Sequence, residues 1–108
     1  MKKLLMTVAV AGTMLLATQA GAVDADAAKA LAQKSGCLAC HAVDHKILGP
    51  AYKDVAAKYK GDKGAEARLV AKVKAGGSGV WGPIPMPANS PQVKDEDIKT
   101  VVQWVLSL

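Results

Sequence analysis

Two cysteines and a histidine within five residues constrain this chain more than any other feature of its sequence. Cys37 and Cys40 stand three positions apart and His41 follows directly, which gives the pattern C-x-x-C-H. This spacing is the attachment signature of c-type haem. On one helical turn, both thiols can form thioethers with the two vinyl groups of a single porphyrin, and the next residue faces the iron. The motif therefore predicts one covalent haem c, held through Cys37 and Cys40, with His41 as an iron ligand.

Two other interpretations of the motif leave more of the chain unexplained. A thioredoxin-like dithiol is expected in a βαβ setting, and no strand pattern surrounds these cysteines. A structural zinc site needs four ligands, usually in two pairs, and beyond the motif the chain offers only His45. A dithiol or zinc protein without haem stays as a third alternative, and it would show no Soret band.

The first 22 residues are typical of an export signal. Lys2 and Lys3 precede an uncharged apolar run over residues 4–17, and Ala20-Gly21-Ala22 supplies a small-residue cleavage site. The run is shorter than the roughly 20 residues that a membrane-spanning helix needs. We therefore expect residues 1–22 to be cleaved and residues 23–108 to form one domain in the periplasm, without membrane insertion.

Charge and composition argue against a nucleic-acid partner. The fourteen basic residues include Lys2 and Lys3, so the mature chain keeps twelve against nine acidic residues, a net charge of +3. They form no basic stripe with interleaved aromatic residues, which nucleic-acid binding would need.

The small mature domain contains no phenylalanine and would have only a modest core of its own. A buried haem would supply the missing apolar bulk.

Helical patterns separated by glycine and proline indicate an all-α fold. Helices are predicted over residues 24–34, 50–59, 65–75 and 95–108, with Gly36 as a left-handed cap after the first. Lys94 is a poor N-cap for the last helix. That helix has the clearest apolar stripe, with Trp104 beside it as a core residue; the stripe consists of Ile98, Val101, Val102, Val105 and Leu106.

Four of the five prolines fall within residues 78–91, which are predicted to form a strap without regular structure. Met86 stands between Pro85 and Pro87, and it is the only methionine beyond the predicted signal. A thioether at the sixth iron position favours Fe(II) and leaves no site open for substrate. The competing ligand is His45, which would have to cross to the opposite face of the ring. The pattern favours Met86.

At this point the chain resembles a known family, the small bacterial class I cytochromes c of the cytochrome c8 group (cytochromes c-551 and c-552). The likeness covers residues 23–108. It rests on residues 36–42 (GCLACHA), 49–56 (GPAYKDVA) and, above all, 79–87 (GVWGPIPMP). The resemblance implies a small class I cytochrome c fold, with four to five helices around one haem and the first and last helices crossing.

The resemblance also assigns roles within the site. His41 and Met86 would be the axial ligands of the iron. The Pro50 carbonyl would accept a hydrogen bond from the His41 ring and so fix its orientation. Trp81 would donate its indole N–H to a haem propionate, and Lys72 would be a basic partner for the propionates.

The remaining expectations concern the pocket and departures from the family pattern. Asn89 would lie near the Met86 sulfur. The pocket would be lined by Leu48, Leu69, Val73 and Ile84. Ala32 stands where relatives often carry a bulky aromatic residue, and Tyr59 stands where some have phenylalanine, an exchange found in heat-stable members. Residues 89–94 are about two residues longer than in the relatives.

The expected function is a periplasmic monohaem electron carrier, monomeric and not an enzyme. In this family the usual partners are an upstream cytochrome complex and, downstream, nitrite reductase or a terminal oxidase. Electrons would pass through an exposed haem edge between the two segments that hold the ring. The alternative is a haem-based enzyme or gas sensor with a labile sixth ligand.

Overall fold

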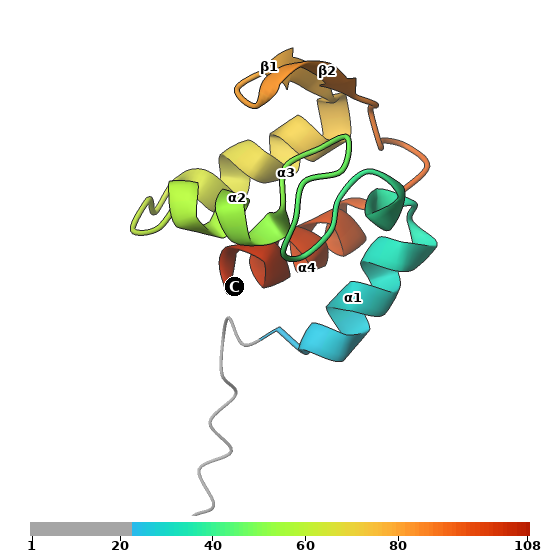
Figure 1. Cartoon of the computed structure of the whole chain (residues 1–108). Coiled ribbons are helices and arrows are strands. Elements are labelled where there is room, and N and C mark those ends of the chain that lie inside the picture. Colours follow the sequence, from blue (N-terminus) through green and yellow to red (C-terminus); the bar gives the residue numbers. More distant parts are fainter. Residues whose placement is uncertain (1–22) are drawn as a thin grey trace, which may run out of the picture.

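The computed structural model describes residues 23–108, so the predicted export signal lies outside the described residues. Most helices form where the sequence predicts them (Figure 1). The elements in chain order are α1 (Ala25–Lys34), the 3₁₀ helix η1 (Cys37–Ala39), α2 (Tyr52–Lys58), α3 (Ala65–Ala75), β1 (Gly77–Gly79), β2 (Gly82–Met86) and α4 (Asp95–Leu106). The all-α class is confirmed, with one short hairpin added.

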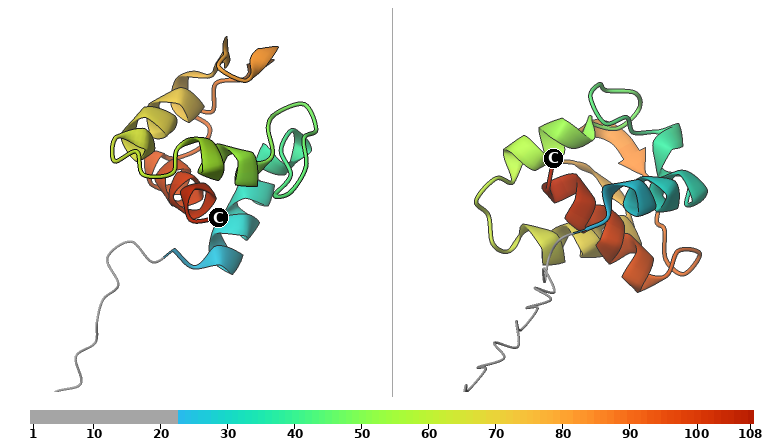
Figure 2. Two further views of the ribbon diagram at one scale, coloured as in Figure 1. Left: turned by 60° about the vertical axis from the view of Figure 1, so that its left-hand side comes forward. Right: turned by 90° about the horizontal axis from the view of Figure 1, so that it is seen from below.

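Helix α4 is the centre of the fold because its apolar stripe is wide enough to serve three neighbours. It packs against α1, α2 and α3, and α1 crosses it in the right-hand view of Figure 2. Ile98, Trp104 and Val105 are at most 5% exposed, which confirms Trp104 as a core residue. Leu106, predicted as part of the stripe, is only half-buried because it lies at the end of the helix.

Two small side chains let α1 approach this core closely. Ala28 and Ala32 are fully buried and join the main apolar cluster with Tyr52, Val55 and Trp104. Asp24 begins the helix as an N-cap, and its carboxylate accepts from the N–H groups of Asp26 and Ala27 at 3.0 and 3.2 Å. Gly36 adopts φ +82° after the helix, as predicted.

Helix α2 begins two residues later than the predicted start at Pro50. Ala51 is the N-cap, with extended backbone (φ −59°, ψ 140°), and Tyr52 is the first helical residue. The Pro50 carbonyl accepts a hydrogen bond from the His41 ring at 2.8 Å instead of one from a helical N–H. The prediction placed Pro50 in the first turn from local preference alone, whereas a contact with a distant residue decides its conformation.

The prediction that residues 78–91 lack regular structure is wrong for their first half. Strands β1 and β2 pair antiparallel, with Gly77 opposite Met86 and Gly79 opposite Gly82, and the register is irregular between these pairs. The hairpin extends from the end of α3 (Figure 1). Prolines are tolerated in β2 because both strands of a two-stranded sheet are edges, so an N–H can be missing on the outer side.

Helix α4 begins without a side-chain cap. Lys94 is its N-cap residue, in extended conformation (φ −65°, ψ 146°), and its side chain makes no capping hydrogen bond. The first N–H groups of the helix therefore lack a side-chain hydrogen-bond acceptor at the cap. Three acidic residues in the first turn interact favourably with the helix dipole but do not replace that hydrogen bond. The expectation that Lys94 is a poor cap is confirmed.

We predict that Lys94→Ser stabilises the protein. The backbone is already in the conformation of a capping residue, so a serine hydroxyl can accept from a first-turn N–H and raise the free energy of unfolding by about 0.5–2 kcal/mol. Chemical denaturation of the haem-loaded protein measures the change. Lys99→Ser, an exposed change within the same helix, is the control, and a Lys94→Ser variant no more stable than wild type would contradict the prediction.

Candidate functional site

One cavity of about 310 Å³ opens between η1 and its following loop, α3, the hairpin and the inner face of α4. This volume lies at the lower end of the range for small-molecule and cofactor sites. The lining is mostly apolar side chains. All twelve residues predicted for the site line it: Cys37, Cys40, His41, Leu48, Pro50, Leu69, Lys72, Val73, Trp81, Ile84, Met86 and Asn89.

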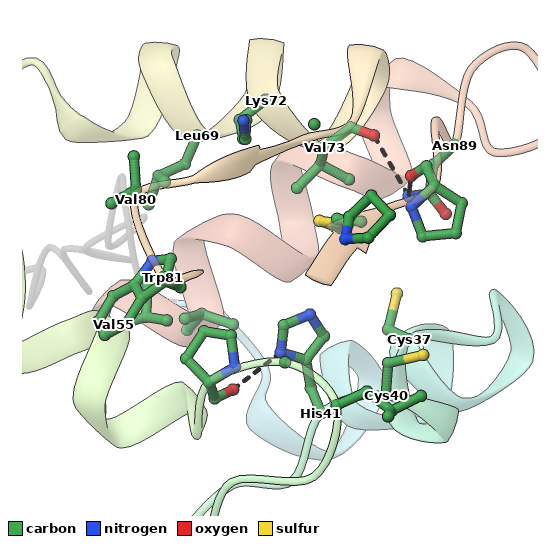
Figure 3. Close-up of a pocket in the computed structure, with 18 of the residues that line it drawn as sticks. Cys37, Cys40, His41, Val55, Leu69, Lys72, Val73, Val80, Trp81 and Asn89 are labelled. Carbon is green, nitrogen blue, oxygen red and sulfur yellow. Dashed lines mark hydrogen bonds between the residues drawn. The ribbon is translucent and has the colours of Figure 1, made fainter. Parts of the chain in front are cut away.

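The motif residues lie together on one wall. In Figure 3, the sulfur atoms of Cys37 and Cys40 point toward the cavity beside the His41 ring, while Leu69, Lys72 and Val73 face them from α3. Both cysteines are free and half-buried. Burial raises the pKa of the Cys37 thiol.

The orientation of His41 is determined by contacts on three sides. Its Nδ1 donates to the Pro50 carbonyl oxygen at 2.8 Å, and because a carbonyl only accepts, Nδ1 carries the hydrogen. In the neutral imidazole, Nε2 is then the nitrogen without a hydrogen, and it can serve as a metal ligand. Tyr52 stacks on the ring with centroids 5.0 Å apart and planes 19° apart. On a third side, Gly49 lies so close that a Cβ there would come within 2.8 Å of Nδ1.

Tyr52 joins this imidazole to the core, and sequence reasoning assigned it no part in the site. Tyr52 is 6% exposed, and its ring meets Trp104 edge-on, with centroids 5.6 Å apart. Burial is the main cause that raises the pKa of its hydroxyl, with the Cys37 thiol adding to the shift. The sequence signal was weak, because an apolar position near the start of a helix is typical of ordinary core residues.

The opposite wall carries Met86 and is tied to α3. Met86 ends β2 and is half-buried. Three residues further, the Asn89 side-chain amide donates to the carbonyls of Val73 at 3.2 Å and Pro87 at 3.1 Å. The Asn89 backbone N–H also reaches the Val73 carbonyl, at 3.1 Å. Asn89 therefore holds the chain that follows Met86 against the end of α3.

The other candidate ligand lies away from the cavity. His45 does not line it, and its side chain is 69% exposed, with Nδ1 2.8 Å from the Asp44 carboxylate. The hydrogen bond with His45 lowers the pKa of Asp44. Within residues 23–108, no three His, Cys, Asp or Glu side chains gather into a metal site, so His45 does not complete a zinc site with the motif.

The residues present fit a haem c. The cavity offers two free thiols, an imidazole whose Nδ1 is bonded to the Pro50 carbonyl, and a thioether, within a mostly apolar lining. These are the groups that thioether attachment and His/Met ligation of iron require. Lys72 supplies a cationic group in the same lining. None of the helices in residues 23–108 is long and apolar enough to span a bilayer.

We predict that Gly49→Ala disturbs the His41 ring. The added Cβ would overlap the imidazole and push it from the Pro50 carbonyl, and overpacking of this kind typically costs about 1–3 kcal/mol. Thermal unfolding of the haem-loaded protein should show the loss, with a changed Soret spectrum. Gly64→Ala is the matched control because its Cβ would meet mainly the flexible end of Arg68. Equal stability of the two variants would contradict the prediction.

Comparison with known proteins agrees with this geometry. The family model for cytochrome c matches residues 25–108. The chain is 63% identical to cytochrome c-551 of Allochromatium vinosum over 78 residues, covering 72% of this chain and 82% of that protein. It is 54% identical to cytochrome c-551 of Pseudomonas aeruginosa over 93 residues, covering 86% and 85%.

A solved structure shows the same arrangement. The crystal structure of wild-type Nitrosomonas europaea cytochrome c552 superposes with a TM-score of 0.69 at 50% identity, covering 78% of this chain and 98% of that one. The class I fold and the c8-group resemblance are thereby confirmed. By sequence, fold and cavity, this chain belongs to the cytochrome c family, and it is an electron carrier with a covalently bound haem c rather than an enzyme.

Proposed function

We propose that the protein carries single electrons in the periplasm, from an upstream cytochrome complex to nitrite reductase or a terminal oxidase. The observation that carries this proposal is that His41 and Met86, from separate segments, line one apolar cavity beside two free thiols. A haem bound there supplies a one-electron Fe(III)/Fe(II) couple. The surrounding residues determine whether small ligands and water can reach the site and how rigidly its side chains are held.

His41 and Met86 would hold the haem iron. The Pro50 carbonyl and the Tyr52 ring hold the imidazole in one orientation, which keeps nuclear rearrangement small when the charge of the site changes. On the other side, Asn89 restrains the backbone that carries Met86. A soft thioether favours the reduced state. Two restrained ligands leave no position for oxygen, peroxide or substrate, so this site suits transfer and not turnover.

Electrons would leave through an exposed edge of the cavity. The flanking residues are mostly exposed and apolar, as a brief contact with a redox partner requires; they are Leu38, Ala39, Ile47, Pro83, Pro85, Pro87 and Ala88. Lys34 and Lys46 are also exposed. Positive charge beside this edge would steer acidic partner surfaces, chiefly by raising the association rate.

We predict that Met86→Ala converts the carrier into a protein with an open iron. The oxidised wild type should show a weak band near ~700 nm, typical of Fe(III)–thioether ligation. Met86→Ala should abolish the band, lower the reduction potential and permit carbon monoxide binding. Met86→His should block carbon monoxide but also lower the potential, because imidazole favours Fe(III) relative to thioether.

Ile84→Ala is the matched control for this experiment, because Ile84 lies in the same strand and lines the same cavity but has no ligating atom. It should keep the band and exclude carbon monoxide. Ready carbon monoxide binding by the reduced wild type at neutral pH would contradict a closed iron and favour the sensor or enzyme function instead.

We predict that the mature protein begins at Val23 and is found in the periplasm. Residues 1–22 have the charge and apolar pattern of an export signal. Mass spectrometry of the purified protein should give the mass of residues 23–108 plus one haem, and acid acetone should leave the colour with the polypeptide. Osmotic-shock fractionation tests the location. A coloured protein that keeps residues 1–22 in the cytoplasm would contradict the proposed export.

A further inference from the structure

The last residue of α2 makes a contact across the molecule that the proposed electron-transfer site does not use. The Lys58 ammonium lies 5.6 Å from the centroid of the Trp81 ring and 5.9 Å from that of Tyr59. Both distances are within the range of a cation–π interaction. Trp81 belongs to the turn between β1 and β2, so this contact joins α2 to the hairpin that carries Met86.

Within residues 23–108, few contacts from other side chains hold this turn. Gly79 and Gly82, which flank Val80 and Trp81, have φ values of +115° and +113°, and a Cβ at either would have no neighbour within 4 Å. Val80 is 58% exposed and Trp81 41%. Within residues 23–108, the cation–π contact from Lys58 is the only side-chain hydrogen bond, ion pair or ring contact that involves this turn.

Lys58 is free to make this contact. It is exposed, and none of the ion pairs among residues 23–108 includes it. Trp81 lines the cavity and Lys58 does not, so the ammonium approaches the indole from outside the cavity. An ammonium on a flexible stem can stay hydrated while one side meets the ring face.

We infer that Lys58 is a positioning residue for Trp81, and that its ammonium holds the indole and the β1–β2 turn against the rest of the molecule at the edge of the haem cavity. Tyr59, the next residue, provides a second ring for the same ammonium. The inference concerns the cohesion of the hairpin. It does not depend on which proteins exchange electrons with this chain or on where in the cell they meet.

The experiment is amide hydrogen exchange by NMR on the reduced, haem-loaded protein, comparing the hairpin amides of Gly79, Gly82 and Met86 with those of α2. Lys58→Gln should accelerate hairpin exchange about two- to fivefold, which is the size expected for an exposed cation–π contact. Lys58→Arg should exchange like wild type, because guanidinium also stacks on aromatic faces. Lys63→Gln is the control, an equal loss of charge at an exposed lysine of the next loop that contacts no ring.

Lysine at the end of α2 also interacts favourably with the helix dipole, and this effect has a separate signature. If Lys58 acts only on its own helix, exchange rises in α2 and not in the hairpin, and the inference is wrong. Unchanged hairpin exchange in Lys58→Gln, or the same acceleration in Lys63→Gln, would also overturn it. A double-mutant cycle supplies the second measurement: Lys58→Gln should have no effect on hairpin exchange in a Trp81→Leu background, and an undiminished effect there would show that the indole is not involved.

Discussion

The hydrogen bond from His41 Nδ1 to the Pro50 carbonyl is the interaction on which the rest of the site depends. It selects the tautomer that leaves Nε2 free, and it removes Pro50 from α2, so that the helix starts at Tyr52. With that start, the Tyr52 ring stacks on the imidazole and meets Trp104 of α4 edge-on. The Pro50 carbonyl and the Tyr52 ring thus connect the proposed iron ligand to α4, the helix against which α1, α2 and α3 pack.

The second wall of the cavity is built on a different principle. No rigid helix carries Met86; a short hairpin does, and the connections at its two ends restrain it. At the start of the hairpin, Gly76 is packed so tightly that a Cβ would come 2.5 Å from the Met86 carbonyl oxygen. Beyond the hairpin, Asn89 binds the carbonyls of Val73 and Pro87. At the turn of the hairpin, the Lys58 ammonium contacts the Trp81 ring. A side chain carried by such a segment is positioned by several weak contacts, and each contact can be tested separately.

The core explains why these walls are stable in so small a domain. Ala28 and Ala32 lie fully buried against the cluster of α4, so α1 can pack closely where a larger side chain would need space. The small side chain of Ala32 therefore corresponds to a contact between α1 and the core. Tyr59 is half-buried against the same cluster, and it also faces the Lys58 ammonium, which gives this tyrosine a contact on each side.

The sequence by itself determined the cofactor chemistry and most of the helices, because both depend on local spacing. The C-x-x-C-H motif keeps its two thiols and its imidazole within five residues, whatever the rest of the chain does. The apolar residues of α4 likewise repeat with the helical period, independently of the elements that pack against them. The residues of the predicted site could also be inferred, through the likeness of residues 23–108 to a family, above all at residues 36–42, 49–56 and 79–87. Only the tertiary structure decided the start of α2, the pairing of β1 with β2, and the parts of Tyr52, Gly49 and Lys58. For α2, the hairpin, Tyr52 and Lys58, the contact joins separate segments of the chain. For Gly49, it depends on how closely the backbone packs against the His41 ring. Local sequence preference alone does not specify such contacts.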